Sequence, residues 1–471
     1  MNANTQSTYL EQGLIEPTPE QSPLWVIPKD LCTRCGSCHV ICPTNVVRFD
    51  DHDFPYIQTE GCINCGLCLK VCPGIDFDMQ KLHQEMFHTD YQTNKMSGVF
   101  QKAYVGHSNM PGVRRDGTAG GVVTHLLIFL LKTGMVDGVI VVGNDPNDPT
   151  MPMPYIARTE DEVRAAAQSK YVAVANTKVL REIRGSHEKF AMVGVACQIH
   201  GLKKLEELNK RLAERVVLTI GLACRGTLEK EAIRDLVEVQ GIRLDDLKRV
   251  SHRGGPFPGK FQAHYDDGRV RDLHHFEYKD GAYNMMLRMY LPDRCHLCPD
   301  YAADFADITC SDMWLRGRDG KYLHPHGSTL FLCRTEKGMR VIEAMVQAGD
   351  LALEEVDQSI VEKSYEHLKR ERKIIPFLRV LQRQQAGKRA PNYGVDAQAV
   401  VSSMSWRDRL YERIYRRTFV FTRYPRLRRL ILRLLLSPLG VAFVFLKIRL
   451  KQVRGALKAR RSRRVSAHTG A

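Results

Sequence analysis

The middle of the chain alternates glycine turns with apolar runs of two different periods. In "GTAGGVVTHLLIFLLKTGMVDGVIVVG", residues 117–143, Val122, Leu126, Phe129 and Leu130 recur at helical spacing, and "GVIVVG" is a short β-branched run. Recurrence at this spacing predicts a helix, and a short continuous β-branched run predicts a strand covered on both faces. The stretch therefore predicts a glycine turn, a helix, a loop and a buried strand, as in an α/β enzyme.

Two further segments repeat this order and add a cysteine. They are "KFAMVGVACQIHGLKKL" and "RVVLTIGLACRGTLEKEAI", and each reads as an apolar strand, a glycine, a cysteine and then a helix. The pattern predicts that Cys197 and Cys224 lie at the ends of two strands, at the rim where α/β proteins form their sites. Taken alone, each is better explained as a small buried apolar side chain.

Near the C-terminus the pattern changes again, and arginine is scattered among leucine. The longest uncharged apolar stretch, Leu434–Leu446, is 13 residues long and is bounded by Arg433 and Lys447. A membrane-spanning helix needs about 20 residues, so we expect a helix lying in the headgroup plane of an anionic membrane. The alternatives are a helical hairpin that dips into one leaflet and a tail that packs on the body or on an acidic protein. Nucleic acid is not expected, because leucine is abundant and no known binding motif is present.

The charge of the chain is concentrated in the same region. The net charge is +16, but residues 401–471 hold 19 Lys or Arg against Asp408 and Glu412, which leaves the other 400 residues at −1. The tail therefore accounts for any attraction to acidic partners, and its removal should touch no proposed cofactor ligand. A hydrophobic fraction of 44% indicates a globular protein, and the length indicates about two to four domains.

The N-terminal region contains two copies of one cysteine motif. The motif "CTRCGSCHVICP" supplies Cys32, Cys35, Cys38 and Cys42, and "CINCGLCLKVCP" supplies Cys62, Cys65, Cys68 and Cys72. The spacing C-x2-C-x2-C-x3-C-P is typical of bacterial two-cluster ferredoxins, in which the fourth cysteine of each motif binds the other cluster. We expect one [4Fe-4S] cluster on Cys32, Cys35, Cys38 and Cys72, and a second on Cys62, Cys65, Cys68 and Cys42. A zinc domain is the alternative.

A further C-x-x-C lies far downstream, at Cys295 and Cys298. Such a pair is suited to gripping a metal but needs two more ligands. Cys197 and Cys224, on the rims of their strands, can supply them. We therefore expect a third [4Fe-4S] cluster held by these four cysteines.

Two cysteines remain outside these sets. Cys310 is the competing ligand for the third cluster, and Cys333, inside "STLFLCRTEKG", lies in a strand-like run and is expected to be core. Fourteen cysteines in a chain of this length favour metal or catalytic use over disulfides. The first residues show no basic start followed by an apolar run, so we expect a cytoplasmic protein whose tail is peripheral on the inner face of the cell membrane.

The glycine turn before Val122 is a candidate binding loop. A glycine turn that opens a helix lets backbone N–H groups approach an anion, with the helix dipole adding to the attraction. A tight turn with no ligand explains the same residues. The chain has no G-x-G-x-x-G, so a nicotinamide-binding Rossmann unit is not expected.

Several stretches together resemble the beta subunits of coenzyme F420 hydrogenases and dehydrogenases, F420 being a deazaflavin hydride carrier. In family order from about residue 99 to 338, they are the segment 117–142 quoted above, "QSKYV", "GVACQIHGLKKL", "GLACRGT", "RGGPFPGKF", "CHLCPDYAADFADITCSDMW" and "GSTLFLCRTEKG". Two departures occur: T-A-G-G replaces the usual S-G-G, and G-V-A-C-Q replaces the usual G-T-P-C-Q. A ferredoxin module ahead of this region is a familiar arrangement in the group.

The resemblance implies a flavin, FAD, that converts the single electrons of clusters into hydride chemistry. The residues matching the family's flavin loop are Gly117, Thr118, Gly120, Gly121 and Thr124, and those matching a second segment beside the flavin are Ser169, Lys170 and Tyr171. From its charge, Lys170 is expected to stabilise the anionic reduced ring; a solvated surface lysine is the alternative. No catalytic residue is identified.

These inferences predict an α+β multidomain protein: a ferredoxin-like two-cluster module, an α/β body that binds flavin and cluster, and a helical basic tail. The expected segments are 1–26 (extension), 27–80 (ferredoxin), 95–185 and 186–360 (the two halves of the beta-subunit body), 361–400 (helical connector) and 401–471 (tail). The expected function is electron transfer between a ferredoxin or hydride carrier and a second substrate. The alternatives are a non-catalytic electron-transfer subunit with a redox partner, and a reductase serving surface-polysaccharide synthesis.

Overall fold

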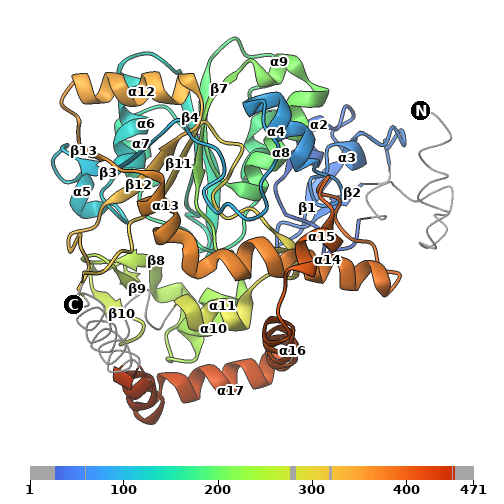
Figure 1. Cartoon of the computed structure of the whole chain (residues 1–471). Coiled ribbons are helices and arrows are strands. Elements are labelled where there is room, and N and C mark those ends of the chain that lie inside the picture. The colour runs from blue at the N-terminus through green and yellow to red at the C-terminus, as the bar shows by residue number, and fades with distance from the viewer. Residues whose placement is uncertain (1–26, 59, 276–282, 318–320, 448, 451–471) are drawn as a thin grey trace, which may run out of the picture.

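The computed structural model describes residues 27–58, 60–275, 283–317, 321–447 and 449–450. The predicted extension at 1–26 and the end of the tail, 451–471, lie outside the described residues. A large mixed sheet forms the centre of the body, with the N-terminal module on one side of it and the C-terminal helices below it in Figure 1.

The central sheet has eight strands in the order β13-β3-β12-β11-β7-β6-β4-β5. Their bounds are β3 Lys102–Ser108, β4 Gly138–Asn144, β5 Pro152–Ala157, β6 Phe190–Val195, β7 Val216–Leu222, β11 Ile308–Asp312, β12 Thr329–Cys333 and β13 Leu351–Glu355. Strands β4, β6, β7 and β11 are mutually parallel, and the outer strands pair antiparallel. The carboxyl ends of the four parallel strands therefore meet at one edge, where α/β proteins form their sites. Both predicted halves of the body contribute strands to this one sheet.

Helices cover both faces of the sheet, as the run "GVIVVG" predicted. Val139 and Val141 of β4 pack with α6 (Val122–Lys132), α7 (Glu160–Ala165) and α12 (Glu336–Gln347) on one face. Ile140 points to the other face and packs with α8 (Ala196–Leu208), α9 (Lys210–Ala213) and the 3-10 helix η2 (Asn176–Arg181). The period of two in this strand is the period expected for side chains that alternate across a sheet.

The N-terminal module shows its internal duplication in the backbone. It contains α2 Ser37–Ile41, β1 Val47–Phe49, β2 Pro55–Ile57, α3 Leu67–Lys70 and α4 Met79–Phe87. Arg34 and Gly36 of the first motif have positive φ, and Asn64 and Gly66, 30 residues later, have positive φ as well. The module is docked on the body: the Arg34 guanidinium lies 2.6 Å from Glu229, and the Thr177 hydroxyl donates to the Cys35 carbonyl.

A smaller unit is inserted between β7 and β11. It consists of the antiparallel strands β8 Leu247–Gly254, β9 Lys260–Tyr265 and β10 Val270–Asp272, with α10 Glu231–Glu238 and α11 Tyr283–Tyr290 packed beside them. Short connecting helices are α5 Val113–Asp116, η3 Leu244–Asp246, η5 Asp293–Leu297, η6 Glu366–Leu368 and a π-helical turn Arg370–Ile374.

The C-terminal helices pack on the body, contrary to the expectation of a separable tail. They are α13 Gln358–Tyr365, α14 Ile375–Gln385, α15 Ala397–Ser402, α16 Trp406–Phe421 and α17 Pro425–Leu436, with the last two beneath α10 and α11 in Figure 1. Leu432 is fully buried, and Glu412 pairs with Arg379 at 2.6 Å. The centroids of the Phe419 and His296 rings lie 4.4 Å apart. In the sequence, His296 stands between Cys295 and Cys298. Removing residues 401–471 would therefore disturb a proposed ligand loop.

Among the described residues, no single helix has the length and apolar character needed to cross a membrane. The pair Pro425–Leu436 and Pro438–Lys447 meets that test only when its two members, bent by 74°, are taken together.

Candidate functional site

The cysteines of the N-terminal module gather in two groups, and each group contains cysteines of both motifs. Burial, followed by the neighbouring Cys72 and Cys35 thiols, raises the pKa of Cys32 to about 12. In the second set, burial and then the Cys65, Cys42 and Cys62 thiols raise the pKa of Cys68 to about 12. The fourth cysteine of each motif thus lies beside a cysteine of the other motif: Cys72 beside Cys32, and Cys42 beside Cys68. The division of the eight cysteines into the ligands of two clusters stays a prediction.

The four cysteines predicted for a third set also come together. Burial raises the pKa of the Cys197 thiol, and the thiols that raise it further are Cys298, Cys295, Cys224 and then Cys35. Burial and next the Cys295 thiol raise the pKa of Cys224 to about 12. The competing ligand, Cys310, is a buried residue of β11 whose thiol neighbour is Cys333. Cys333 is fully buried in β12, as predicted.

The chemistry of these donors fits iron–sulfur clusters. All fourteen cysteines are free thiols, and each set places four of them where their thiolates repel one another. A cationic iron core would remove that repulsion, because metal binding takes up thiolates and releases their protons. In the described part of the chain, no three His, Cys, Asp or Glu side chains are placed to hold a single metal ion.

A large cavity opens at the edge where the parallel strands end. Its volume is about 2220 Å³, and its wall includes the ends of β6 and β7 and the last three residues of β11. A cavity for one drug-sized ligand typically measures about 300–1,000 Å³. The cavity therefore has room for a large cofactor together with a second ligand.

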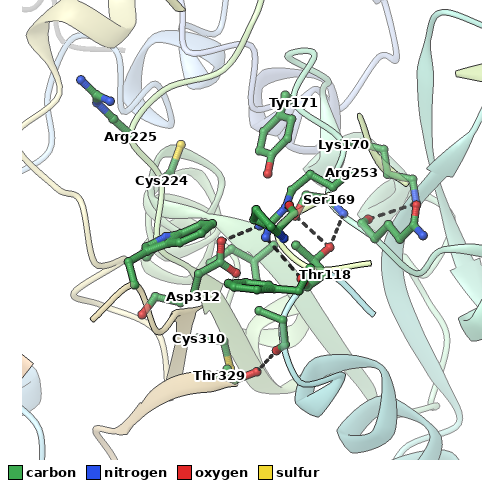
Figure 2. A pocket seen from close by; sticks show the side chains of 18 of the residues that line it. Thr118, Ser169, Lys170, Tyr171, Cys224, Arg225, Arg253, Cys310, Asp312 and Thr329 are labelled. Atoms are coloured by element: carbon green, nitrogen blue, oxygen red, sulfur yellow. Dashed lines mark hydrogen bonds and ion pairs between the residues drawn. The ribbon is translucent and has the colours of Figure 1, made fainter. Parts of the chain in front are cut away.

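The wall of this cavity contains most of the residues predicted for flavin binding: Gly117, Thr118, Gly121, Thr124, Ser169, Lys170 and Tyr171. The backbone N–H of Ser169 donates to Thr118 Oγ1 at 2.9 Å, which ties the glycine turn to the second segment. Figure 2 shows these two residues with Arg253 near the middle of the cavity wall and Cys224 to one side. Two predicted segments, distant in sequence, thus form one wall.

Gly120 belongs to the same turn but does not line the cavity. A Cβ added to it would lie 2.9 Å from the Gly106 carbonyl oxygen and 3.0 Å from the Thr329 amide nitrogen. A glycine is needed at this position because the backbone packs closely against β3 and β12 and because φ is +78°.

The helix that follows the turn presents its N-terminus to the cavity. Gly121 is the N-cap of α6, has φ 73°, and has no side chain to accept a hydrogen bond from the first-turn amides. Gly121 and the first three helical residues, 122–124, all line the cavity. Because the first amides of a helix have no partner within it and carry the positive end of its dipole, this arrangement can hold an anion such as a phosphate.

The ammonium group of Lys170 is engaged by the backbone. Nζ donates to the carbonyls of Ala166 at 2.8 Å, of Gln168 at 3.2 Å and of Ala167, beyond the C-terminal end of α7. Burial and the Arg249 charge lower the pKa of Lys170 to about 7, while the three carbonyls favour the charged form. Lys170 is therefore not a solvated surface lysine, and its three donors are directed at the backbone. Its role toward a reduced flavin stays a prediction.

An arginine that sequence reasoning missed lies at the centre of the wall. The Arg253 guanidinium pairs with the Asp312 carboxylate, donates to the Pro258 carbonyl at 2.9 Å, and lies 5.2 Å from the centre of the Trp314 ring. The Phe257 and Trp314 rings are stacked with their centroids 5.3 Å apart. These residues belong to "RGGPFPGKF" and "CSDMW", quoted above for the resemblance. The sequence offered one signal: each motif holds a charged residue close to an aromatic residue. Only the fold shows that the two motifs meet and that Arg253 is buried.

Comparison with known proteins identifies three matching regions. Residues 103–181 match the N-terminal part, and residues 187–359 the C-terminal part, of the beta subunit in the family described as "Coenzyme F420 hydrogenase/dehydrogenase". Residues 31–74 match the "4Fe-4S dicluster domain". The two beta-subunit matches together cover more than half of the chain.

Three curated relatives show the range of proteins to which the chain is similar. A coenzyme F420-dependent sulfite reductase of Methanocaldococcus jannaschii is 26% identical over 71% of this chain and 49% of its own length. A beta subunit of the coenzyme F420 hydrogenase of Methanococcus voltae is 29% identical over 55% of this chain and 86% of its own length. One of the subunits of the F(420)H(2) dehydrogenase of Methanosarcina mazei is 25% identical over 68% of this chain and 83% of its own length.

The chain spans about half the length of the sulfite reductase. All three relatives are oxidoreductases or parts of them by name. The dicluster match covers the eight N-terminal cysteines, and the two beta-subunit matches cover the third cysteine set and most of the cavity wall. The chain belongs to the family of coenzyme F420 hydrogenase/dehydrogenase beta subunits.

Proposed function

We propose that the chain is an iron–sulfur flavoprotein oxidoreductase. It passes electrons between a ferredoxin or a hydride carrier of the F420 type and a second substrate, through three [4Fe-4S] clusters and FAD. The names of the relatives support this class of carrier, and the arrangement of the thiols supports the route.

The order of the cysteine sets is the observation that carries the proposal. Cys68, from the second N-terminal set, is a neighbour of Cys38 in the first. Cys35 of that set is in turn a neighbour of Cys197 in the third. Cys224 of the third set lines the cavity. Clusters bound to these sets would form a continuous path from the ferredoxin module to the cavity.

The chain's own residues would hold the flavin along one wall of the cavity. The amides at the N-terminus of α6 would bind its phosphates, and the Thr118–Ser169 pair would fix the two segments beside it. Arg253, held by Asp312, would place a positive charge near the ring system. Bound there, flavin supplies conversion between one-electron and two-electron transfer.

A second candidate is a protein that only relays electrons to a catalytic partner. The Methanococcus voltae relative, which is named as part of a hydrogenase, favours it. The two candidates separate in an assay of the isolated protein with a reduced carrier: turnover of an added acceptor without a partner supports the oxidoreductase, and its absence in a protein with full iron and flavin supports the relay.

Iron content tests the clusters themselves. Anaerobically purified protein should hold about twelve irons per chain, four for each cluster, with FAD in the denatured extract. Cys295→Ala should lower this by about four irons, because it removes a ligand of the third set, and should leave the N-terminal pair intact. Cys310→Ala is the matched control and should keep the full count. Equal iron in the two variants would remove the third cluster from the proposal.

For the basic C-terminal region, we propose contact with an anionic membrane surface on the inner face of the cell membrane. Residues 401–471 carry a net charge of +17 against −1 for the rest of the chain. Each basic residue near an anionic surface contributes about 1 kcal/mol at low salt, and apolar side chains add a contribution that salt does not screen.

A further inference from the structure

The C-terminal helices form part of the wall of the large cavity. α17 is followed, after a bend of 74°, by the helical segment Pro438–Lys447. Leu435 lines the cavity from α17, and Phe443 and Val444 line it from the following segment. The region that carries the basic charge therefore also borders the site proposed for the flavin.

The body holds α17 in this position. Arg429 Nε donates to Asp235 Oδ1 at 2.6 Å, and an Arg428 nitrogen lies 3.2 Å from Asp235 Oδ2. The Asp235 side chain is buried in α10, where it also accepts a hydrogen bond from the Tyr290 hydroxyl. Leu432 is fully buried among residues of α10 and α11. Buried charges that are paired in this way resist separation, so α17 is a fixed part of the fold.

The opposite face of the same segment is apolar and exposed. Leu439, Leu446 and Leu450 are 84%, 57% and 50% exposed, at a spacing that places them on one side of a helix. Leu434 of α17 is 59% exposed. A helix that is apolar on both faces is buried on both faces when it functions, and contiguous exposed apolar surface marks an interaction site.

The charges around this face indicate what covers it. The exposed basic residues that flank it are Arg426, Arg433, Lys447 and Arg449. On α16, exposed Trp406, Leu410 and Ile414 follow one another at four-residue spacing. Apolar side chains in the midst of arginine suit the boundary between anionic headgroups and acyl chains, where both kinds of side chain are satisfied at once. An acidic protein surface would satisfy the arginines alone.

We propose that this helical segment seats the mouth of the cavity on an anionic bilayer, and that the second substrate is an amphiphile presented by the membrane. Its polar head would enter the cavity, and its apolar chain would lie along Leu435, Phe443 and Val444. The inference rests on the proposed function, because it assigns the substrate class of that same site.

Fluorescence quenching by brominated lipid tests the position of the cavity mouth. The chain has three tryptophans, Trp25, Trp314 and Trp406, and Trp314 lines the cavity. A W25F/W406F variant, which keeps only Trp314, should lose emission in anionic phosphatidylglycerol vesicles whose acyl chains carry bromine near the headgroup, relative to unbrominated vesicles. The W25F/W314F variant, which keeps only Trp406, should lose emission too.

The control places the reporter on the ferredoxin module. A Y56W chain that lacks the native tryptophans should show the same emission in both kinds of vesicle, since Tyr56 is exposed on β2, away from the tail. If Trp406 were quenched and Trp314 were not, the membrane would cover the helices but not the mouth of the cavity, and the inference would be overturned. It would also be overturned if neither tryptophan were quenched. Iron and flavin contents, measured in the same samples, test the proposed function separately. The ratio of emission in brominated to unbrominated vesicles can be measured whether or not the cofactors are bound.

A monomeric amphiphile tests the substrate class. Dibrominated stearate below its micelle concentration should quench the Trp314-only chain saturably, and V444D in that chain should weaken the quenching at least tenfold by placing a charge on the inner wall. L439D/L446D changes only exposed positions and should lower the affinity for anionic vesicles at least tenfold while leaving stearate quenching unchanged. V346D, an exposed position on α12, should leave both unchanged. Absence of saturable stearate quenching would overturn the assignment.

Discussion

At the scale of single residues, His252 shows how the wall of the cavity limits protonation. It is buried in β8, and its Nδ1 accepts a hydrogen bond from the Tyr171 backbone N–H at 2.8 Å. Burial, and then the Lys170 charge, lower the pKa of His252 to about 3. The ring is therefore neutral in the folded protein, and its neutral form fixes the backbone at Tyr171.

Because the folded pKa of His252 lies below the unfolded value of about 6.5, the unfolded chain binds more protons as the pH falls. The contribution of His252 to stability is complete above pH 6.5 and should decline by about 1.4 kcal/mol per pH unit, or about 2 kcal/mol at pH 5. Anaerobic amide hydrogen exchange of β8 and β9 measures it. H252N should lose this part of the pH dependence, whereas H187N, at an exposed histidine, should keep it. An identical slope in H252N would show that His252 is protonated in the fold.

Arg253 gives a second prediction at this scale. R253M leaves the Asp312 carboxylate, with 18% side-chain exposure, without its partner. Removing one member of a buried pair lowers the free energy of unfolding by about 3–5 kcal/mol. Because Asp312 is partly exposed, we expect a loss of about 3 kcal/mol. The thermal midpoint should fall and flavin retention with it. R253K keeps the charge and should recover part of both, and a thermal midpoint equal to that of the wild type in R253M would refute the pairing.

At the scale of elements, the glycine turn and the segment after α7 act together through Thr118. T118V removes the acceptor of the Ser169 N–H, and the Thr118–Ser169 hydroxyl contact at 3.3 Å is lost as well. Each lost hydrogen bond costs about 0.5–1.5 kcal/mol, so flavin should bind about tenfold more weakly. Flavin released by ultrafiltration measures this. T133V, at the far end of α6, is the control; equal retention in both variants would mean that the two segments bind independently.

Local patterns predicted the elements whose residues decide their own structure. The spacing of Val122 and Leu126 predicted α6, and the β-branched run 138–143 predicted β4, because a helix face or a strand covered on both sides is written in consecutive residues. Motif spacing likewise predicted that cysteines of the two motifs lie together, and their division into cluster ligands stays a prediction. The direction of the Lys170 ammonium group and the meeting of Arg253 with Asp312 depend on contacts between distant segments, so no local pattern contained them.

At the scale of the whole molecule, the tail has two parts with different expected roles: residues 401–450, which include the helices packed on the body, and residues 451–471. Removing 401–471 would take Leu432 from its buried site and Glu412 from Arg379. Burial of one leucine contributes about 1.5–3 kcal/mol, and loss of a buried partner costs more. This truncation should lower the thermal midpoint and the iron content together.

A chain ending at residue 450 should behave differently. It keeps α15 to α17 but loses seven Lys or Arg and no acidic residue. It should keep its iron and flavin and bind anionic vesicles more weakly at low salt, with the remaining binding less sensitive to salt because it is apolar. Cosedimentation over a salt series measures this. Unchanged binding at every salt concentration would show that the last 21 residues do not take part.

The docking of the ferredoxin module on the body, through Arg34 with Glu229 and Thr177 with the Cys35 carbonyl, has a kinetic consequence. A separate ferredoxin must meet its acceptor by diffusion for each electron, so its rate depends on the concentrations of both proteins. A covalently joined module has an effective concentration that dilution does not change. In the proposed route, transfer from the second set of cysteines to the cavity should therefore proceed at the same rate at any protein concentration. Only two encounters would then remain limited by diffusion: the one with the external carrier and the one with the second substrate.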